Sequence, residues 1–327
     1  MREWQYWTRN KLSILAGYLP AFNVASSKKS PERLYIDLMA GEPFNRDALT
    51  GEEFDGSARL ALSSTPPFTH IALCEMEQKA AALKQDLRVR YPDRDDFKVY
   101  PGDCNETIVQ VLADLDEWRW APTFVFADQQ AAEIHWETLK KIAAFRNGKT
   151  KAEIWLLTSP SMVIKGVAGT NGDAFARRVD ALYGTRDWRR IQLARDRDTI
   201  SAEEYRDEMV NLQRWRLEQD LGYVMTARIP MRMPSGMPIY DMVFATDHPV
   251  GNKIMTGLYR KAAEREPLMR QEAKAKAKDK RSREAGLDTL FDLPPSSIPV
   301  DTLSWAPTDS WDPRTRPWWH QEPALPD

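Results

Sequence analysis

The feature that most constrains the fold is a repeated design in which an apolar strand ends in an acid. Residues 33–41 read Arg-Leu-Tyr-Ile-Asp-Leu-Met-Ala-Gly, so an apolar run meets Asp37 and a small-residue turn follows. Residues 124–128 and 69–75 repeat the strand and the terminal acid. In open α/β sheets, ligands bind beyond the carboxyl ends of the strands, where such acids gather. The pattern therefore predicts a doubly wound α/β domain with a site at that edge.

Strand and helix patterns alternate with short loops, which favours a parallel sheet with helices on both faces. We expect strands at 34–38, 69–75, 97–100, 123–127 and 152–157, and helices at 11–19, 57–62, 77–90, 105–115 and 134–145. Pro20 is expected to end the first helix, and residues 42–56 are expected to form a polar loop. Strands at 222–231 and 239–245 predict an antiparallel hairpin that completes the sheet, and a helix is expected at 250–265.

Charge and composition divide the chain into parts. We predict a first part of the core at 1–159, an arginine-rich helical insertion at 160–218, a sheet-completing hairpin and helix at 219–265, and a basic arm with an acidic tail at 266–327. Residues 260–283 hold ten Lys or Arg and four acids, which is typical of a long exposed helix. Residues 284–327 hold eight prolines and four tryptophans, which predicts an extended, irregular segment.

Composition limits the classes of function. The formal net charge of −2 gives no overall attraction to nucleic acid or anionic membranes, so any such binding has to be local. Cys74 and Cys104 are too few for a disulfide framework or a cysteine metal site, and the four histidines lack zinc spacing, so we predict no metal. No apolar run approaches the roughly 20 residues of a membrane span, and the N-terminus does not resemble a signal peptide. We expect a cytoplasmic protein.

At Tyr35-Ile-Asp-Leu-Met-Ala-Gly41 the chain resembles the three-Cys-motif partner proteins. The motifs that agree are residues 11–20, Gly102-Asp-Cys-Asn105, Ala127-Asp128 followed by Ile134-His-Trp136, and 244–252. The similarity covers roughly residues 8–265. The resemblance implies a methyltransferase-like Rossmann fold, which the antiparallel hairpin suits. It also implies a bacterial or phage-linked role on nucleic acid, in DNA repair or phage defence, beside a radical-SAM-like protein with a three-cysteine motif.

Two positions depart from the family's pattern. The loop after the first strand usually reads like Ala-Gly-Pro-Gly, and here it is Ala40-Gly-Glu-Pro43. The fourth strand usually ends like Asp-Pro-Phe-Gly, and here it is Asp128-Gln-Gln-Ala131. Glu42 adds a negative charge where the methionine carboxylate of S-adenosylmethionine would approach. The departures favour an accessory protein with a degenerate cofactor site. The alternative is an active S-adenosylmethionine-dependent nucleic-acid methyltransferase.

Four residues would form the cofactor site. Asp37 would lie near the methionine part of S-adenosylmethionine, and Gly41 would let the backbone approach it, because glycine has no Cβ. Glu75 would accept hydrogen bonds from the ribose hydroxyls, and Asp103 would meet the adenine amino group. The alternative is that these acids cap helices or end strands, as acids often do.

Asp128 and His135 are the best catalytic candidates. A carboxylate at the end of the fourth strand can accept a proton or orient a nucleophile, and histidine suits proton transfer near neutrality. The two lie seven positions apart in the sequence, so their contact depends on the intervening loop. We favour the alternative, in which Asp128 bonds backbone amides and His135 starts a helix with Trp136.

The arginine-rich insertion is the predicted contact with nucleic acid or a partner. Tryptophan and arginine side chains alternate in it, and such an arrangement can bind single-stranded or extruded nucleotides. The residues concerned are Trp188, Arg189, Arg190, Arg214, Trp215 and Arg216. The alternative is ion pairing within the helices, because eight acids lie among the ten arginines of residues 174–217.

The C-terminal tail carries two further candidates. Leu290 and Phe291 lie in Gly-Leu-Asp-Thr-Leu-Phe, which resembles the short peptide that docks bacterial proteins on the DNA sliding clamp. We favour the alternative, in which this peptide packs on its own domain. The four tail tryptophans are costly to leave in water, so they mark a contact surface, either with a partner or within the chain.

Overall fold

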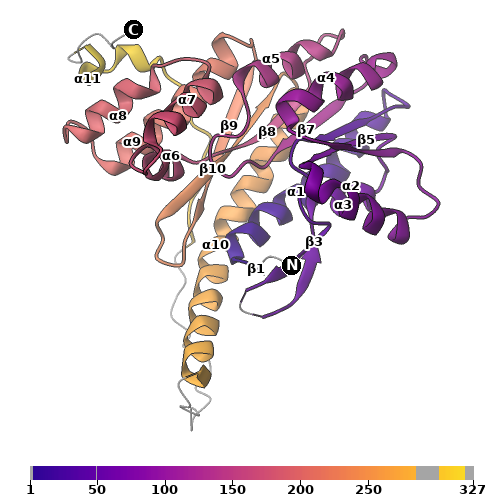
Figure 1. The fold of residues 1–327 in the computed structure, drawn as a ribbon, viewed down its shortest axis with the longest axis horizontal. Coiled ribbons are helices and arrows are strands. Elements are labelled where there is room, and N and C mark those ends of the chain that lie inside the picture. The colour runs from indigo at the N-terminus through magenta and orange to yellow at the C-terminus, as the bar shows by residue number, and fades with distance from the viewer. Residues whose placement is uncertain (1–2, 49, 285–301, 321–327) are drawn as a thin grey trace.

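The computed structural model describes residues 3–48, 50–284 and 302–320. Within them, seven strands form one sheet in the order β6-β5-β2-β7-β8-β10-β9 (Figure 1). The strands are β2 (Leu34–Asp37), β5 (His70–Glu75), β6 (Phe97–Pro101), β7 (Thr123–Ala127), β8 (Glu153–Thr158), β9 (Met225–Arg232) and β10 (Pro238–Thr246). The five from β6 to β8 are parallel, whereas β10 is antiparallel to both of its neighbours. The predicted fold, a mostly parallel methyltransferase-like Rossmann sheet with an antiparallel edge hairpin, is confirmed.

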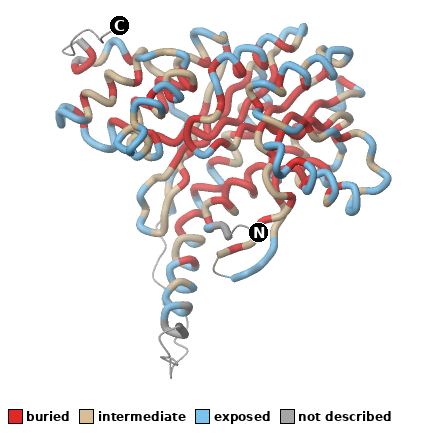
Figure 2. Tube along the Cα trace, in the orientation of Figure 1, coloured by how far each residue is buried: buried red, intermediate tan, exposed pale blue. Residues whose placement is uncertain are grey.

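Alternate side chains of each strand enter different cores. Tyr35, for example, joins the core on the first face of the sheet, whereas Ile36 joins the core on the second face. The five strands from β5 to β10 are accordingly almost fully buried, whereas the edge strands β6 and β9 are only partly buried (Figure 2). The helices on the first face are α1 (Tyr6–Ser27), α2 (Ser57–Leu62), α3 (Glu77–Arg90) and α10 (Pro249–Glu284). Those on the second are α4 (Cys104–Asp114), α5 (Trp136–Phe145) and α9 (Ala202–Gln219), and a short 3-10 helix η1 (Asp116–Trp118) follows α4.

The prediction that Pro20 ends the first helix is wrong, because α1 continues through it to Ser27. A proline inside a helix costs about 3 kcal/mol, since it removes a hydrogen bond and crowds the preceding turn. Burial offsets this cost: Tyr18, Leu19 and Phe22 flank the proline and are buried against the sheet. Tertiary packing therefore overrides the local signal.

The predicted polar loop at 42–56 is also wrong, because it contains two short strands. β3 (Phe44–Asp47) pairs in parallel with β1 (Glu3–Trp4) and in antiparallel fashion with β4 (Glu53–Asp55). Strands of two to four residues are too short to show a period-2 pattern, so no periodicity in the sequence indicates them.

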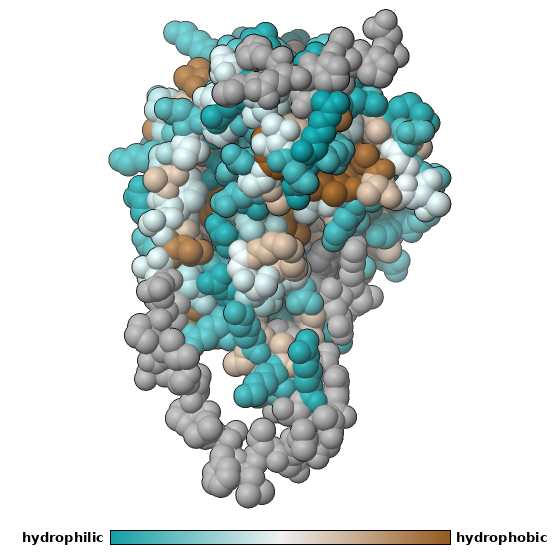
Figure 3. All heavy atoms as spheres, turned by 90° about the vertical axis from the view of Figure 1, so that its left-hand side faces the viewer, coloured by the Kyte–Doolittle hydropathy of each residue, from teal (hydrophilic) through white to brown (hydrophobic). Residues whose placement is uncertain are grey.

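Residues 160–218 contain four helices with their own apolar cluster. These are α6 (Pro160–Val167), α7 (Gly172–Tyr183), α8 (Trp188–Asp196) and α9. A capping box starts α9, in which the Ser201 side chain accepts from the Glu204 N–H and the Glu204 carboxylate accepts from the Ser201 N–H. The face of the molecule at this end is mostly hydrophilic, with smaller hydrophobic areas (Figure 3).

Helix α10 combines two segments that were predicted as separate helices. It runs 36 residues, through Pro267, and its C-terminal part projects from the body of the protein (Figure 1). Its first half packs beside α1, where Tyr6 donates to Glu266 at 2.9 Å and Arg265 donates to Asn10 at 2.8 Å. The predicted helix at 250–265 and the predicted basic helix are therefore one element.

Residues 302–320, which we term the strap, return from the tail across the insertion. Asn211 holds the Trp311 backbone on both sides, donating to its carbonyl at 2.8 Å and accepting from its N–H at 2.9 Å. Trp305 donates to the Arg228 carbonyl at 3.0 Å. Trp318 and Trp319 enter the apolar cluster of the insertion. The strap ends in η2 (Pro313–Thr315) and α11 (Pro317–His320). The contact surface of the tail tryptophans thus lies within the chain.

Candidate functional site

The predicted acids follow the carboxyl ends of the parallel strands. Asp37 ends β2 and Glu75 ends β5, its neighbour, while Asp128 directly follows β7 on the other side of β2. The chain reverses its winding direction at β2, which is where open α/β sheets bind ligands. Asp103 follows β6, one strand further out. The topology therefore brings these residues to one edge, and their individual partners decide what that edge can bind.

Glu75 holds the loop after β2. Its Oε2 accepts from the Gly41 N–H at 2.6 Å and its Oε1 accepts from the Met76 N–H at 2.9 Å. Gly41 has φ +66°, a left-handed conformation that favours glycine and turns its N–H toward the carboxylate. Only 8% of Glu75 is exposed. The carboxylate predicted to hold a ribose instead binds the protein's own backbone.

Asp37 lies completely inside the protein. Its carboxylate accepts from the Tyr35 hydroxyl at 3.0 Å and from the Met39 N–H at 3.2 Å. Burial and, to a smaller extent, the nearby Asp128 charge together raise the pKa of Asp37 to about 7, against the opposing effect of its hydrogen bonds. Asp37 therefore stabilises the turn after β2 through the hydrogen bond from Met39, and its buried side chain presents no surface to a ligand.

Asp103 caps α4 and is exposed. Its side chain accepts from the Asn105 N–H at 2.8 Å, which satisfies one of the free amides of the helix terminus. This is the structural role that the sequence left open as the alternative to adenine binding.

Asp128 forms an ion pair with Lys11 of α1. The ammonium contacts both carboxylate oxygens, and its side chain is 4% exposed against 26% for Asp128. The same ammonium lies 5.6 Å from the centre of the Tyr240 ring. Sequence reasoning missed Lys11, although its spacing from Leu15 and Tyr18 places it on the buried face of the helix.

The structure does not bring His135 to Asp128. His135 lies just before α5 and is exposed, and its backbone N–H donates to Oδ1 of Asn105 at 2.8 Å. In the described part of the chain no hydrogen bond or ion pair joins it to Asp128. Gln129 holds the intervening loop, donating to the Leu157 carbonyl at 2.9 Å and accepting from the Ile134 N–H at 3.1 Å. The predicted catalytic pair therefore does not form here, and His135 starts a helix, as in the favoured alternative.

The interleaved rings and arginines of the insertion mainly contact the chain itself. Trp188 is 1% exposed and donates to Asp180 at 2.8 Å, and Arg189 binds both oxygens of Asp180. Arg190 lies 5.3 Å from the centre of the Trp319 ring of the strap. These contacts match ion pairing and internal packing, the alternative to nucleic-acid binding.

The second group of the insertion behaves similarly. Arg214 is 1% exposed and donates to Thr226 and to the Thr308 carbonyl of the strap. Arg216 binds Asp220 at 2.6 Å and lies 4.5 Å from the centre of the Trp136 ring, whereas Trp215 is half-buried. Arg214 is thus unavailable to a partner while the strap is in place.

The remaining predictions concern the tail and metals. Leu290 and Phe291, the predicted clamp-docking pair, lie outside the described residues. Among the described residues, no group of three or more His, Cys, Asp or Glu side chains is placed to hold a metal ion. No helix that the structure describes has the length and apolarity needed to cross a membrane.

Neither a protein-family model nor a curated protein sequence matches this chain. Similar solved structures include TYW2 of M. jannaschii in complex with AdoMet, at 9% identity, 70% coverage of this chain, 75% of that chain and a TM-score of 0.32. A putative caffeoyl-CoA O-methyltransferase from Staphylococcus aureus shows 12% identity, coverages of 69% and 81%, and a TM-score of 0.35. A conserved hypothetical protein from Streptococcus pyogenes shows 17% identity, coverages of 42% and 76%, and a TM-score of 0.28. At these values the likeness adds nothing about activity. The sheet order itself makes the chain a methyltransferase-like Rossmann protein by fold.

Proposed function

We propose that this protein is an accessory protein of the three-Cys-motif partner type, with a degenerate S-adenosylmethionine site, which acts on nucleic acid beside a radical-SAM-like three-cysteine protein. The observation that carries the proposal is the engagement of Glu75 by the Gly41 and Met76 N–H groups. A ribose would have to displace the loop from this carboxylate, so the arrangement does not fit the cofactor as it stands.

S-adenosylmethionine and its demethylated product should therefore bind weakly or not at all. In calorimetric titrations of the full-length protein we expect a Kd weaker than about 1 mM, which corresponds to less than about 4 kcal/mol of binding free energy. Glu75→Gln should not change this result, because the Glu75 carboxylate makes no contact with the ligand.

The matched control is Glu77→Gln, which changes an exposed acid two residues away at the start of α3. Micromolar binding that Glu75→Gln weakens and Glu77→Gln preserves would contradict the degenerate site. That outcome would favour the active methyltransferase, and a methyl acceptor would then be sought among DNA and RNA.

The projecting part of α10 supports the nucleic-acid side of the proposal. Lys274, Lys276 and Lys278 are exposed on it, and in the part of the chain that the structure describes none of them forms an ion pair. Unpaired lysines on a projecting helix can follow a phosphate backbone, whereas the arginines of the insertion are mostly engaged. The structure thus favours α10 over the insertion as the contact.

Charge reversal on this arm should weaken binding to a fluorescent single-stranded or duplex DNA. For Lys274→Glu/Lys276→Glu/Lys278→Glu we expect at least about ten-fold lower affinity at low salt, and a shallower dependence of log K on log salt, because fewer counterions are released. Fluorescence anisotropy at several salt concentrations measures both quantities.

A triple variant of equal charge provides the control. Lys79→Glu/Lys84→Glu/Lys141→Glu changes exposed lysines on α3 and α5 and should keep most of the affinity. Equal losses in the two triple variants would mean that net charge, not the α10 arm, governs binding, and the assignment to α10 would fail.

A further inference from the structure

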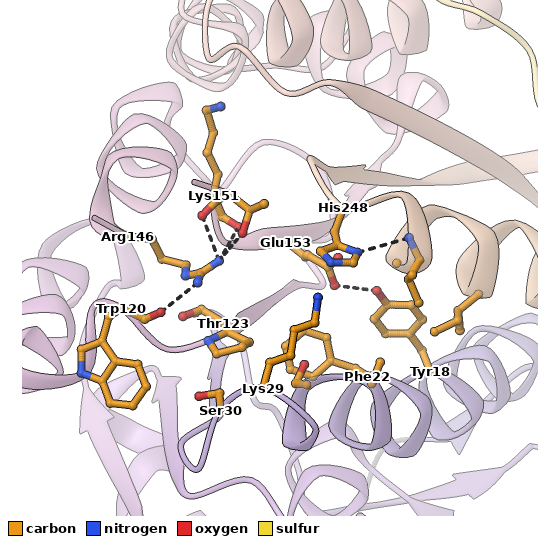
Figure 4. A pocket seen from close by; sticks show the side chains of 17 residues that line it. Tyr18, Phe22, Lys29, Ser30, Trp120, Thr123, Arg146, Lys151, Glu153 and His248 are labelled. Carbon is orange, nitrogen blue, oxygen red and sulfur yellow. Dashed lines mark hydrogen bonds between the residues drawn. The ribbon is translucent and has the colours of Figure 1, made fainter. Parts of the chain in front are cut away.

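A second candidate site lies at the opposite edge of the sheet. A pocket of about 310 Å³ opens beside Thr123 and Glu153, which are the first residues of β7 and β8 (Figure 4). The C-terminal half of α1 and the first turns of α10 form its other walls. Its volume is at the lower end of the range for small-molecule sites, about 300–1,000 Å³. The pocket is remote from the carboxyl edge that holds Asp37 and Glu75.

Two cations line this pocket without a carboxylate partner. Lys29 follows α1, and its side chain extends into the space that the lining residues enclose (Figure 4). Arg146 donates to the Thr150 carbonyl at 2.8 Å and to the Trp120 carbonyl at 2.9 Å. Within the described residues neither cation forms an ion pair, and the buried Arg146 Nε has no hydrogen-bond partner. The positive charge of the pocket is therefore compensated by carbonyl and hydroxyl dipoles and, without an ion pair, by the Glu153 and Asp247 carboxylates, which favour the charged form of Arg146.

The other charged groups add little negative charge. Lys151 is engaged elsewhere, with the Gly222 carbonyl at 2.8 Å and with Asp247 at 3.2 Å. Glu153 accepts from the Tyr18 hydroxyl at 2.5 Å and from Thr246 at 2.7 Å, and burial raises its pKa to about 7. A carboxyl that is partly neutral near pH 7 repels an anion less than an ordinary carboxylate does.

The positive end of a helix also faces this pocket. Helix α10 begins at Pro249, and Val250 and Gly251 of its first turn line the cavity. A helix N-terminus favours a negative group by its dipole, and here the Val250 N–H already donates to Nδ1 of His248 at 3.2 Å. Aromatic side chains complete the wall: Phe22 is buried, and Trp120 is 44% exposed. The lining thus holds two aromatic side chains beside the groups that attract an anion.

We propose that this pocket binds a small aromatic anion of mononucleotide size, with its phosphate or carboxylate near Lys29 and Arg146 and its ring against Phe22 and Trp120. The proposal does not depend on the proposed function, because the two sites lie at opposite edges of the sheet. A ring and a phosphate on one molecule would use both halves of the lining, whereas either alone would use one.

Titrations of the full-length protein with adenosine 5′-monophosphate, adenosine and ribose 5-phosphate test the proposal. We expect saturable binding of the nucleotide, and binding of each fragment at least about ten-fold weaker. Lys29→Met should weaken nucleotide binding by about ten-fold or more, because a charge-assisted contact is lost. Trp120→Ala should weaken nucleotide binding and leave that of ribose 5-phosphate unchanged.

Lys28→Met is the matched control, since Lys28 is the adjacent exposed lysine and does not line the pocket. It should bind the nucleotide like the unaltered protein. Equal affinities of Lys28→Met and Lys29→Met would overturn the proposal, because the nucleotide would then bind elsewhere. No saturable binding of the nucleotide at millimolar concentration would also overturn it.

Discussion

Asp128→Asn should destabilise the protein by about 3 kcal/mol, because it leaves the ammonium of Lys11 buried without its counter-charge. Lys11 is 4% exposed at its side chain, so water does not replace the lost partner. Lys11→Met should cost less, about 1 kcal/mol, since Asp128 retains some contact with solvent. The free energy of unfolding in urea measures both effects.

The double variant Lys11→Met/Asp128→Asn tests the cause. We expect its stability to be close to that of Lys11→Met alone, because Asp128→Asn is harmful only while the ammonium is present. Asp114→Asn is the control, since the ion pair of Asp114 with Lys98 is exposed and worth about 0–1 kcal/mol. Suppose instead that Asp128→Asn lowered the free energy of unfolding no more than Asp114→Asn. The Lys11–Asp128 ion pair would then not stabilise the fold, and Asp128 would again be a candidate catalytic residue.

Asn211→Ala should release the strap. The substitution removes the two hydrogen bonds that hold the Trp311 backbone, and we expect a loss of about 2–3 kcal/mol because those backbone groups lose their partners. Trp318 and Trp319 should then leave their cluster more often, and the bond after Arg314 should become accessible to trypsin, whereas Arg316 precedes Pro317 and is not a cleavage site. The free energy of unfolding and the rate of tryptic cleavage report the two effects.

Gln219→Ala is the matched control for the strap, because Gln219 is an exposed amide on the same helix. Its effect should stay within about 0.5 kcal/mol. Cleavage of Asn211→Ala at the rate of Gln219→Ala would mean that Asn211 does not hold the strap.

The strands of the sheet were predictable because they are apolar and an acid or another polar residue marks the end of most of them. β7 was placed at its observed residues, and β8 shifted by one residue at each end. The small sheet of β1, β3 and β4 was not predictable, since its strands are too short for a period and one of them pairs with a distant segment. Propensity correctly described most helices, whereas the end of α1 depended on burial around Pro20.

The position of the acids at the carboxyl edge of the sheet was predictable, but their hydrogen-bond and ion-pair partners were not. The topology placed Asp37, Glu75 and Asp128 along one edge, as the strand endings indicated. The partner of Asp128 is a lysine on the first helix, and no local pattern connects two residues so far apart in the chain. Likewise, alternating arginines and tryptophans signal an interface equally well whether the other side is a partner or the chain's own strap.

Because α1 and α10 lie side by side on one face of the sheet, a helix near the start of this sequence packs against one that is made much later. The buried face of α1 stays exposed until α10 is made, and β8 lacks its neighbour until β10 has followed β9. Contacts between such distant segments are slow to form, and exposed apolar surface invites aggregation in the meantime. The sheet and the core on its first face can therefore be completed only after β10 and α10 have been made.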